Sequence, residues 1–374
     1  MSIPIVKMPF SPEDNEKIAQ EARLLLASGQ LAMGEKTLLF ERAFSEFIGT
    51  PYALSVGSGT QALEIIFRAL DPSGASVCVP ALTFMATAFA PIAAGAKIVL
   101  VDVDPATLQM DPEDLRKKMR TDTRAVILVH LGGFISPEYQ EIKDIAARGG
   151  AVLIEDASHA HGAEICGHKA GTLGLAAAFS FYATKVLTTG EGGMVTSSTE
   201  SLYSQMQIIR QHGQIRPGSN IHEQFGLNYR PSELNALLGI SVMGRAQAIV
   251  SSRREAARVY DELLQGTKLT PIKPGTGVLP SYYKYIVLLP HHISRELVKE
   301  KLYSLYSQRL AGEVYASTLA EQPFWPRAPE TLAEQPFGLN GAKEAARRQI
   351  CLPIWPGIDP EDQSLLVQRL LEVL

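Results

Sequence analysis

The chain has 374 residues, of which 46% are hydrophobic and 20% are charged, a balance typical of a globular protein with a full core. Its formal net charge of −4 at pH 7 leaves no basic surface of the kind that binds nucleic acid. The most apolar stretch, residues 85–101, is interrupted by Pro91, Gly95 and Lys97, so it is too short and too broken to span a membrane. We therefore expect neither a nucleic-acid partner nor a membrane partner.

The cysteines and the N-terminus indicate where the protein works. Cys78, Cys166 and Cys351 lie far apart, and the first residues lack the basic-then-apolar pattern of a signal peptide. An odd number of widely spaced cysteines argues for a reducing compartment, and against both disulfides and a zinc site. These features predict a cytoplasmic protein.

The first half of the chain alternates between helical and strand-like patterns. Residues 11–49 hold two helical patterns, and Ser11-Pro12-Glu13-Asp14 opens the first with an early proline and acids. Strands are then expected at 52–56, 76–79, 97–101, 125–130 and 151–155, and helices at 61–70, 85–93, 112–119 and 137–148. Strands that are apolar on both faces and separated by helices predict an α/β protein with a parallel sheet covered by helices.

The second half begins with two β-prone runs in residues 178–196, joined by a polar link that contains Gly190-Glu191-Gly192-Gly193. After a helix at 202–211 and a polar loop, Pro231 opens a long helical pattern over 231–264. We expect this helix to lead from a large domain, residues 1–250, to a small C-terminal domain, residues 251–374. The small domain is expected to contain a strand at 283–289, helices at 294–306 and 363–374, and a surface loop at 323–336.

Gly57-Ser58-Gly59-Thr60 follows a strand and opens a helix. Backbone N–H groups and the helix dipole converge on such a turn, and phosphate is its usual ligand. With Ala62 the segment also fits the loose dinucleotide pattern G-x-G-x-x-G/A. A tight turn that needs glycine explains the residues equally well.

The strand at 151–154 delivers Glu155 and Asp156 at its C-terminal end, where parallel sheets build their sites, and His159 follows. Taken alone, an aspartate that caps the next segment and a structural loop histidine explain this pattern at least as well. A metal site with His161 and His168 is the weaker alternative, because no cysteine or acid spacing completes a familiar ligand set.

Lys185 lies between the two β-prone runs of residues 178–196. A desolvated, neutral lysine attacks carbonyls to form a Schiff base, although a solvated loop lysine is the simpler reading of the residue alone. A phosphate cradle, an acid at a strand end about one hundred residues later, and then a lysine are together what pyridoxal phosphate (PLP) requires. The three features in this order predict a PLP site.

Six blocks of sequence resemble the DegT/DnrJ/StrS family of PLP-dependent aminotransferases, and the resemblance runs from about residue 10 to the C-terminus. The blocks are Gly57-Ser58-Gly59-Thr60-Gln61-Ala62-Leu63, Pro80-Ala81-Leu82-Thr83-Phe84, Glu155-Asp156-Ala157-Ser158-His159-Ala160-His161-Gly162, Ser180 with Lys185, Gly226-Leu227-Asn228-Tyr229-Arg230, and Leu352-Pro353-Ile354-Trp355-Pro356-Gly357. The resemblance implies the PLP fold-type I architecture, with sites at the C-terminal edge of the sheet.

The resemblance also implies roles for four residues around the cofactor ring. Lys185 would form the Schiff base with PLP and then move the proton during transamination. Asp156 would pair with the pyridine nitrogen, so that the ring can accept electrons. His159 would contact the ring hydroxyl, and Phe84 would stack on the ring.

The same resemblance assigns the phosphate to Gly59, Thr60 and Ser180. Asn228 would reach that phosphate from a neighbouring subunit, which implies a homodimer with shared sites. Arg230 matches an arginine of the family and is a candidate substrate residue.

The implied reaction moves an amino group from an amino acid, glutamate or glutamine, through pyridoxamine phosphate to a ketone. Acceptors suggested by the resemblance are a nucleotide-linked keto sugar, as in amino-sugar or antibiotic biosynthesis, and, as an alternative, a cyclitol ketone or an aminohydroxybenzoate-type precursor. Two departures from the family concern this acceptor: Ala320 stands where a histidine is usual, and His130-Leu131-Gly132-Gly133 replaces His-Leu-Tyr-Gly.

Two other classes of function remain. A nicotinamide-dependent oxidoreductase would rest on Gly57 and Gly59, and it leaves Lys185 and Asp156 unexplained. A PLP-dependent sugar dehydratase or a regulatory PLP-binding protein is the more distant alternative, and related dehydratases replace the lysine with histidine.

Overall fold

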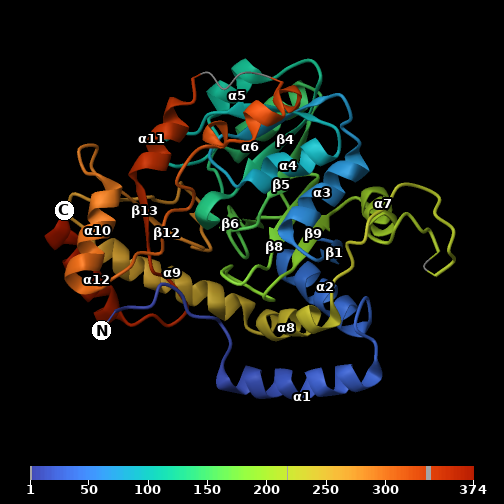
Figure 1. The fold of residues 1–374 in the computed structure, drawn as a ribbon, viewed down its shortest axis with the longest axis horizontal. Coiled ribbons are helices and arrows are strands. Elements are labelled where there is room, and N and C mark those ends of the chain that lie inside the picture. The colour runs from blue at the N-terminus through green and yellow to red at the C-terminus, as the bar shows by residue number, and fades with distance from the viewer. Residues whose placement is uncertain (1, 217, 334–337) are drawn as a thin grey trace.

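A computed structural model describes residues 2–216, 218–333 and 338–374 of the chain (Figure 1). Its centre is a seven-stranded sheet in the order β1-β9-β8-β5-β4-β2-β3. The strands are β1 (Tyr52–Val56), β2 (Ser76–Pro80), β3 (Lys97–Val101), β4 (Thr123–Val129), β5 (Val152–Asp156), β8 (Ala176–Ser180) and β9 (Gly193–Ser197). The alternation of short strands and helices expected from the sequence is confirmed.

The sheet is parallel from β3 to β8, and β9 alone runs against its neighbours. The antiparallel pairing follows from the connection, because only residues 181–192 join β8 to β9 and no crossover helix separates them. Ser180 pairs with Gly193 at the end of this hairpin, and Val56 of β1 pairs with the same glycine. Three chain segments therefore meet at one point of the sheet edge.

Helices cover both faces of the sheet, and side chains alternate between them along each strand. In β1, Leu54 belongs to the cluster formed with α3 and α4, whereas Ala53 belongs to the cluster formed with α2 and α8. A third cluster packs α5 and α6 over β2 to β5. The helices of this part are α1 (Pro12–Ser28), α2 (Glu35–Ile48), α3 (Gly59–Leu70), α4 (Met85–Ala93), α5 (Pro112–Lys118), α6 (Tyr139–Arg148), α7 (Glu200–Arg210) and α8 (Glu233–Met243).

The C-terminal part has its own three-stranded sheet, β10-β12-β13. Its elements are α9 (Ala246–Leu263), β10 (Thr270–Pro271), β12 (Tyr285–Leu288), α10 (Arg295–Tyr306), α11 (Asn340–Arg348), β13 (Gln349–Leu352) and α12 (Pro360–Val373). A small antiparallel sheet, β11 (Val278–Leu279), β6 (Glu164–Ile165) and β7 (His168–Lys169), joins the two parts. The strand and helices expected after residue 283 are present, and residues 334–337 of the expected surface loop lie outside the described residues.

The single long helix expected over 231–264 is wrong. Two helices, α8 and α9, occupy this segment and meet at a bend of 62°. Gly244 ends the first, and Arg245 leaves the helical conformation with φ −127° and ψ 13°. The Arg245 guanidinium binds the carbonyl of Pro9 and the carboxylate of Asp14, so the bend is fixed by the segment that leads into α1. The proposed boundary at residue 250 falls inside α9.

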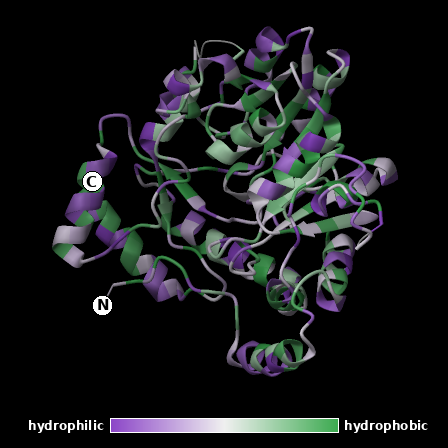
Figure 2. Ribbon diagram, turned by 45° about the vertical axis from the view of Figure 1, so that its right-hand side comes forward, coloured by the Kyte–Doolittle hydropathy of each residue, from purple (hydrophilic) through white to green (hydrophobic). Residues whose placement is uncertain are grey.

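Helix α1 lies at the edge of the molecule beside α8, and it carries hydrophobic as well as hydrophilic residues (Figures 1 and 2). Leu25 is its only residue buried within the described chain, whereas Leu24 and Leu26 are 61% and 57% exposed. Within the described residues, no single helix is long and apolar enough to cross a membrane, although the bent pair α8 and α9 together would meet the test of length and composition.

Candidate active site

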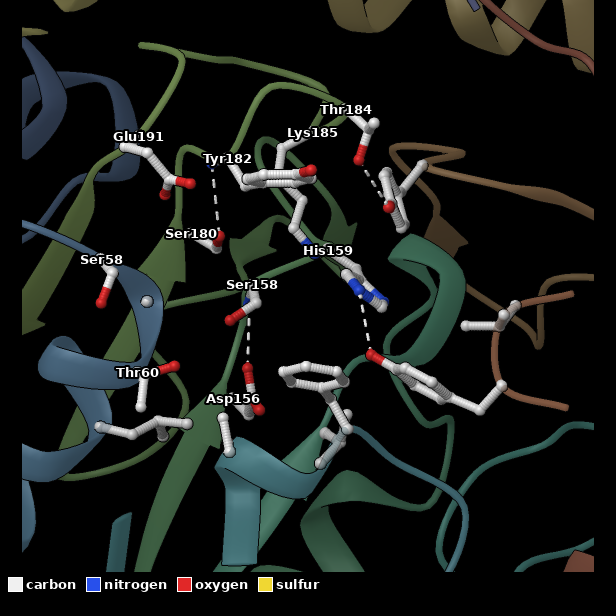
Figure 3. Close-up of a pocket in the computed structure, with 18 residues that line it drawn as sticks. Ser58, Thr60, Asp156, Ser158, His159, Ser180, Tyr182, Thr184, Lys185 and Glu191 are labelled. Atoms are coloured by element: carbon white, nitrogen blue, oxygen red, sulfur yellow. Dashed lines mark hydrogen bonds between the residues drawn. The ribbon is translucent and has the colours of Figure 1, made fainter. Parts of the chain in front are cut away.

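A cavity of about 350 Å³ opens at the carboxyl ends of the parallel strands (Figure 3). Its floor comes from residues that end or follow β1, β4, β5 and β8, and its cover comes from the C-terminal part. The lining residues are Ser58, Gly59, Thr60, Leu63, Phe84, Ala86, Val129, Asp156, Ser158, His159, Ser180, Tyr182, Thr184, Lys185, Glu191, Tyr283, Val314 and Tyr315. The cavity therefore brings together all the predicted site residues except Asn228 and Arg230.

One end of the cavity is a cradle between the start of α3 and the end of β8. Ser58 caps α3, because its hydroxyl accepts a hydrogen bond from the Gln61 N–H at 3.2 Å. A Cβ on Gly59 would lie 2.7 Å from the Ser180 Cβ, and a Cβ on Gly193 would lie 2.1 Å from the Ser58 carbonyl oxygen. Both glycines are needed for this close approach, which leaves the first N–H groups of α3 and the hydroxyls of Thr60 and Ser180 at an anion-sized site.

Asp156 lies at the end of β5 and points into the middle of the cavity (Figure 3). Its Oδ2 accepts a hydrogen bond from the Thr87 hydroxyl at 2.8 Å, and its Oδ1 accepts one from the Ser158 N–H at 3.2 Å. The Thr83 and Thr87 hydroxyls are 2.9 Å apart. Since Thr87 donates its proton to the carboxylate, Thr83 donates to Thr87. The carboxylate is thus held in one orientation by a buried chain of two threonines.

Glu155, the other acid of the predicted pair, faces away from the cavity because adjacent strand residues point to opposite faces. Its buried carboxylate accepts hydrogen bonds from the backbone of Gly171, Leu173 and Gly174 at 2.7–2.8 Å and contacts the His130 ring at 2.8 Å. Glu155 therefore fixes the loop that precedes β8.

The Lys185 side chain reaches from the β8–β9 connection into the cavity, toward His159 (Figure 3). Burial lowers the pKa of Lys185, the Lys284 charge lowers it further, and Tyr283 and Asp156 oppose this effect. A lower pKa increases the neutral fraction of the amine, which is the form that attacks a carbonyl. Lys185 is therefore a partly buried residue of the cavity lining and not a fully solvated loop lysine.

His159 is 5% exposed and lies beside Lys185. Its Nδ1 accepts a hydrogen bond from the Gly132 N–H at 3.3 Å, so the ring proton is assigned to Nε2, which is 3.4 Å from the Tyr315 hydroxyl. Burial holds the pKa of His159 well below its usual range, and the charges of Lys185 and Lys284 add to the effect. The residue is therefore a neutral imidazole with an N–H available toward the cavity.

Phe84 is 58% exposed although it lines the cavity. Its ring is stacked at 26° to the Tyr315 ring, with 6.1 Å between centroids. A large apolar ring exposed inside a cavity is a surface that a planar ligand can cover.

Asn228 and Arg230 lie outside the cavity. Asn228 is exposed, and its backbone forms an isolated bridge with Gln211, while Arg230 is half-buried. Their part in the site stays a prediction. Ala320, where the sequence departs from the family, also lies outside the cavity lining, and Val314 and Tyr315 occupy that side instead.

Sequence reasoning missed Thr87 and the two tyrosines of the cover, Tyr283 and Tyr315. Thr87 could have been found as a polar residue inside an apolar helix, one turn after Thr83. Tyr283 and Tyr315 carry no comparable local signal, because they reach the cavity only through contacts between distant parts of the chain.

Comparisons with known proteins agree with this geometry. Residues 12–371 match the DegT/DnrJ/EryC1/StrS aminotransferase family. The chain belongs to this family. Relatives include the uncharacterized protein MJ1066 of Methanocaldococcus jannaschii, 33% identical over 98% of this chain and 97% of its own. The GDP-perosamine synthase of Vibrio cholerae is 29% identical over 85% of both chains.

The solved structure of Helicobacter pylori PseC, an aminotransferase involved in the biosynthesis of pseudoaminic acid, has the same fold. Its TM-score is 0.89 at 25% identity, over 100% of this chain and 99% of that one. The predicted fold-type I architecture is confirmed, and the protein is a PLP-dependent aminotransferase.

The residues of the cavity fit this cofactor. The cradle at Gly59 suits its phosphate, the oriented carboxylate of Asp156 suits its ring nitrogen, and Lys185 and the neutral imidazole of His159 line the same cavity. The exposed face of Phe84 suits a planar ring. When bound, PLP supplies a ring that accepts the electrons of a carbanion.

Proposed function

We propose that this protein transfers an amino group from an amino acid, glutamate or glutamine, to a keto sugar that is linked to a nucleotide, in the biosynthesis of amino sugars. The similarity to aminotransferases named for GDP-perosamine and for pseudoaminic acid biosynthesis, over 85% and 100% of this chain, carries the proposal. A 4-aminotransferase of dTDP-4-dehydro-2,3,6-trideoxy-D-glucose from Saccharopolyspora spinosa, 29% identical over 90% of this chain, supports the same class of acceptor.

Within this proposal the residues act as follows. The N–H groups at Gly59 and the hydroxyls of Thr60 and Ser180 bind the phosphate, and Phe84 packs on one face of the ring. Asp156 keeps the ring nitrogen protonated. All of these residues line one cavity, which supports the proposal.

Two further residues complete the proposed chemistry. His159 donates its Nε2–H toward the ring hydroxyl, because its Nδ1 already accepts from Gly132. Lys185 would link to the cofactor and, once released, would move the proton from the donor Cα to C4′ of the cofactor; in the second half of the cycle it would move a proton in the reverse direction, from C4′ to the acceptor carbon. Its lowered pKa supports the role of a base.

The acceptor would enter on the open side of the cavity. Tyr182 and Glu191 are exposed polar residues of the lining, and Ser158 also lines the cavity; Tyr182 is 48% exposed. Hydroxyl, phenol and carboxylate groups suit the hydroxyls of a sugar, and they suit those of a cyclitol as well. The cyclitol ketone therefore remains the second candidate.

We further propose that the active form is a homodimer with shared sites. Leu24 and Leu26 of α1 and Leu38 of α2 are exposed apolar side chains of the kind that a partner covers, and Leu38 is 63% exposed. The segment that holds Asn228 and Arg230 also exposes Ile221 and Phe225, at 62% and 63%. A second copy that covers these residues would bring its Asn228 and Arg230 to this chain's cofactor, and gel filtration of the purified protein would test it.

The experiment for the cofactor uses its visible absorption. Purified protein should take up PLP as a coloured species, and borohydride reduction should fix the cofactor to the peptide that contains Lys185. Lys185→Ala should lose this covalent link, whereas Lys284→Ala, the matched control, should keep it. A wild-type chain that binds no PLP would refute the proposed function.

The experiment for the substrates treats each half-reaction separately. Glutamate or glutamine should remove the visible absorption of the bound cofactor, and a keto sugar linked to a nucleotide should restore that absorption. Restoration by a cyclitol ketone but by no nucleotide sugar would select the second candidate. Asp156→Ala should keep the covalent link yet lose nearly all turnover, and near-normal turnover would show that the assignment of Asp156 is wrong.

A further inference from the structure

Tyr283 lies between two lysines at the cover of the cavity. The Lys185 Nζ is 4.6 Å from the centroid of its ring, and the Lys284 Nζ is 5.4 Å away. Its hydroxyl is 3.1 Å from the Thr184 hydroxyl, a contact drawn in Figure 3, and its ring centroid is 4.3 Å from that of His159. Tyr283 therefore contacts three neighbours: the amine of Lys185, the hydroxyl of Thr184 and the imidazole of His159.

The backbone around Tyr283 is held in place from both sides. The buried Arg253 donates from Nε to the Tyr282 carbonyl at 2.9 Å and from Nη2 to the Tyr283 carbonyl at 3.0 Å. On the other side, Gly133 has φ +93°, and a Cβ there would lie 2.9 Å from the Tyr283 nitrogen. The ring is thus a fixed wall of the site, although it comes from a segment about one hundred residues after Lys185.

We propose that Tyr283 is a positioning residue for Lys185. The face of the Tyr283 ring holds the Lys185 amine whenever that amine is not bound to the cofactor. The inference rests on the proposed function and names a residue that the family resemblance did not assign. Lysine has a flexible four-carbon stem, and a released amine could leave the reacting carbon. An aromatic face attracts an ammonium group, and the attraction is stronger where water is excluded.

The charges around Lys185 agree with this role. Burial disfavours its ammonium form and lowers its pKa, and the nearby Lys284 acts in the same direction. Asp156 opposes them from the floor of the cavity. His159, which lines the same cavity, and His161, on which the Lys185 charge also acts, are neutral because burial lowers the pKa of both.

Tyr283 itself responds to the two lysines. Burial would raise the pKa of its hydroxyl, but Lys185, Lys284 and the hydrogen bond with Thr184 together lower the pKa below its usual value. This effect acts on the hydroxyl and is separate from the contact of the ring face with the amine at 4.6 Å. In the wild type the ring face should favour the ammonium form of Lys185 and so offset part of the effect of burial, which favours the neutral amine.

The test measures the reactivity of Lys185 in the full chain freed of cofactor. The rate at which acetic anhydride labels Lys185, followed by mass spectrometry across a pH series, gives the pH midpoint of the amine. Tyr283→Leu removes the aromatic face, so the midpoint should fall by about one pH unit. Tyr283→Phe keeps the face and removes only the charge interaction of the hydroxyl, so its midpoint should fall much less than that of the leucine variant. Tyr283→Met serves as a second removal variant if the leucine variant does not fold.

The matched control is Tyr182→Leu. Tyr182 lines the same cavity, yet no cation lies over its ring in the described part of the chain, so the labelling midpoint of Lys185 should not move. In the loaded enzyme, Tyr283→Leu should lower kcat by about tenfold or more with little change in KM, because release and return of the amine are affected rather than substrate binding.

Two results would overturn the proposal: an unchanged midpoint in Tyr283→Leu and Tyr283→Met, or a shift in Tyr283→Phe as large as in the leucine variant, which would assign the effect to the hydroxyl. The labelling needs no cofactor. A failure of the proposed function, seen as a wild-type chain that does not bind PLP, is therefore distinguishable from a failure of this inference.

Discussion

The orientation of Asp156 depends on Thr87, and replacing Thr87 by valine tests this dependence. Valine has nearly the shape of threonine, so Thr87→Val removes the hydroxyl without opening a cavity in α4. The Thr87 side chain is fully buried, and no water can replace its hydrogen bond to Asp156, which is 2.8 Å long. The variant therefore leaves one carboxylate oxygen without its donor.

The loss of stability depends on whether the lost hydrogen bond goes to a charged group or to a neutral one. A hydrogen bond to a charged group contributes about 1.5–3 kcal/mol, whereas one between two hydroxyls contributes about 1 kcal/mol. Thr87→Val should therefore lower the free energy of unfolding by about 2 kcal/mol. Thr83→Val, which removes only the 2.9 Å contact behind it, should cost about 1 kcal/mol. The affinity for PLP should fall about tenfold in Thr87→Val, because Asp156 is then free to turn away from the ring nitrogen.

The assay combines urea unfolding of the cofactor-free chain with a PLP titration followed by visible absorption. Thr87→Ser is the control, because it keeps the hydroxyl and loses only a methyl group. It should bind PLP as the wild type does, even if the lost methyl lowers its stability. Equal PLP affinity in the serine and valine variants would refute the role of the hydroxyl.

Two more predictions concern a buried histidine outside the cavity lining and a glycine of the cradle. Burial lowers the pKa of His161 to about 3 from 6.5, so below about pH 6.5 the unfolded chain binds a proton that the folded chain does not. Between pH 6.5 and 4.5 the free energy of unfolding of the wild type should fall as this proton binds to the unfolded chain, and in His161→Leu the fall should be smaller by about 1.4 kcal/mol per pH unit. Urea unfolding at both pH values measures this, and an equal fall in the wild type and the variant would show that the reasoning is wrong. Gly59→Ala places a Cβ 2.7 Å from the Ser180 Cβ and should weaken PLP binding at least tenfold. In Gly57→Ala the new Cβ meets only the flexible end of Gln61, so a PLP titration should show a much smaller loss.

The floor of the site could be predicted from the sequence because each of its residues follows a strand. Gly59, Asp156 and Ser180 lie where β1, β5 and β8 end, and the carboxyl ends of parallel strands meet at one edge of a sheet. Lys185 follows β8 by a few residues and therefore reaches the same edge. Short-range signals were sufficient here, since strand direction and strand length decide the position.

The helix break at Gly244 and the cover of the cavity could not be predicted in this way. No proline marks the bend between α8 and α9, and the contacts that fix the bend come from Pro9 and Asp14, far away in the sequence. Tyr283 reaches Lys185 only because Gly133 allows its backbone to approach. A local pattern contains no information about such long-range contacts.

The different origins of floor and cover suggest how relatives can share a reaction and differ in substrate. The floor residues sit at strand ends, and a Cβ on Gly193 would meet the Ser58 carbonyl oxygen at 2.1 Å, so a substitution there disturbs the sheet as well as the cofactor. Val314 and Tyr315, in contrast, lie in the irregular segment between α10 and α11, where the backbone is not part of a sheet. We therefore expect exchanges at Val314 to change the choice of acceptor and to leave PLP binding intact. The fold retained at 25% identity with the Helicobacter pylori enzyme is what such a division of the site would permit.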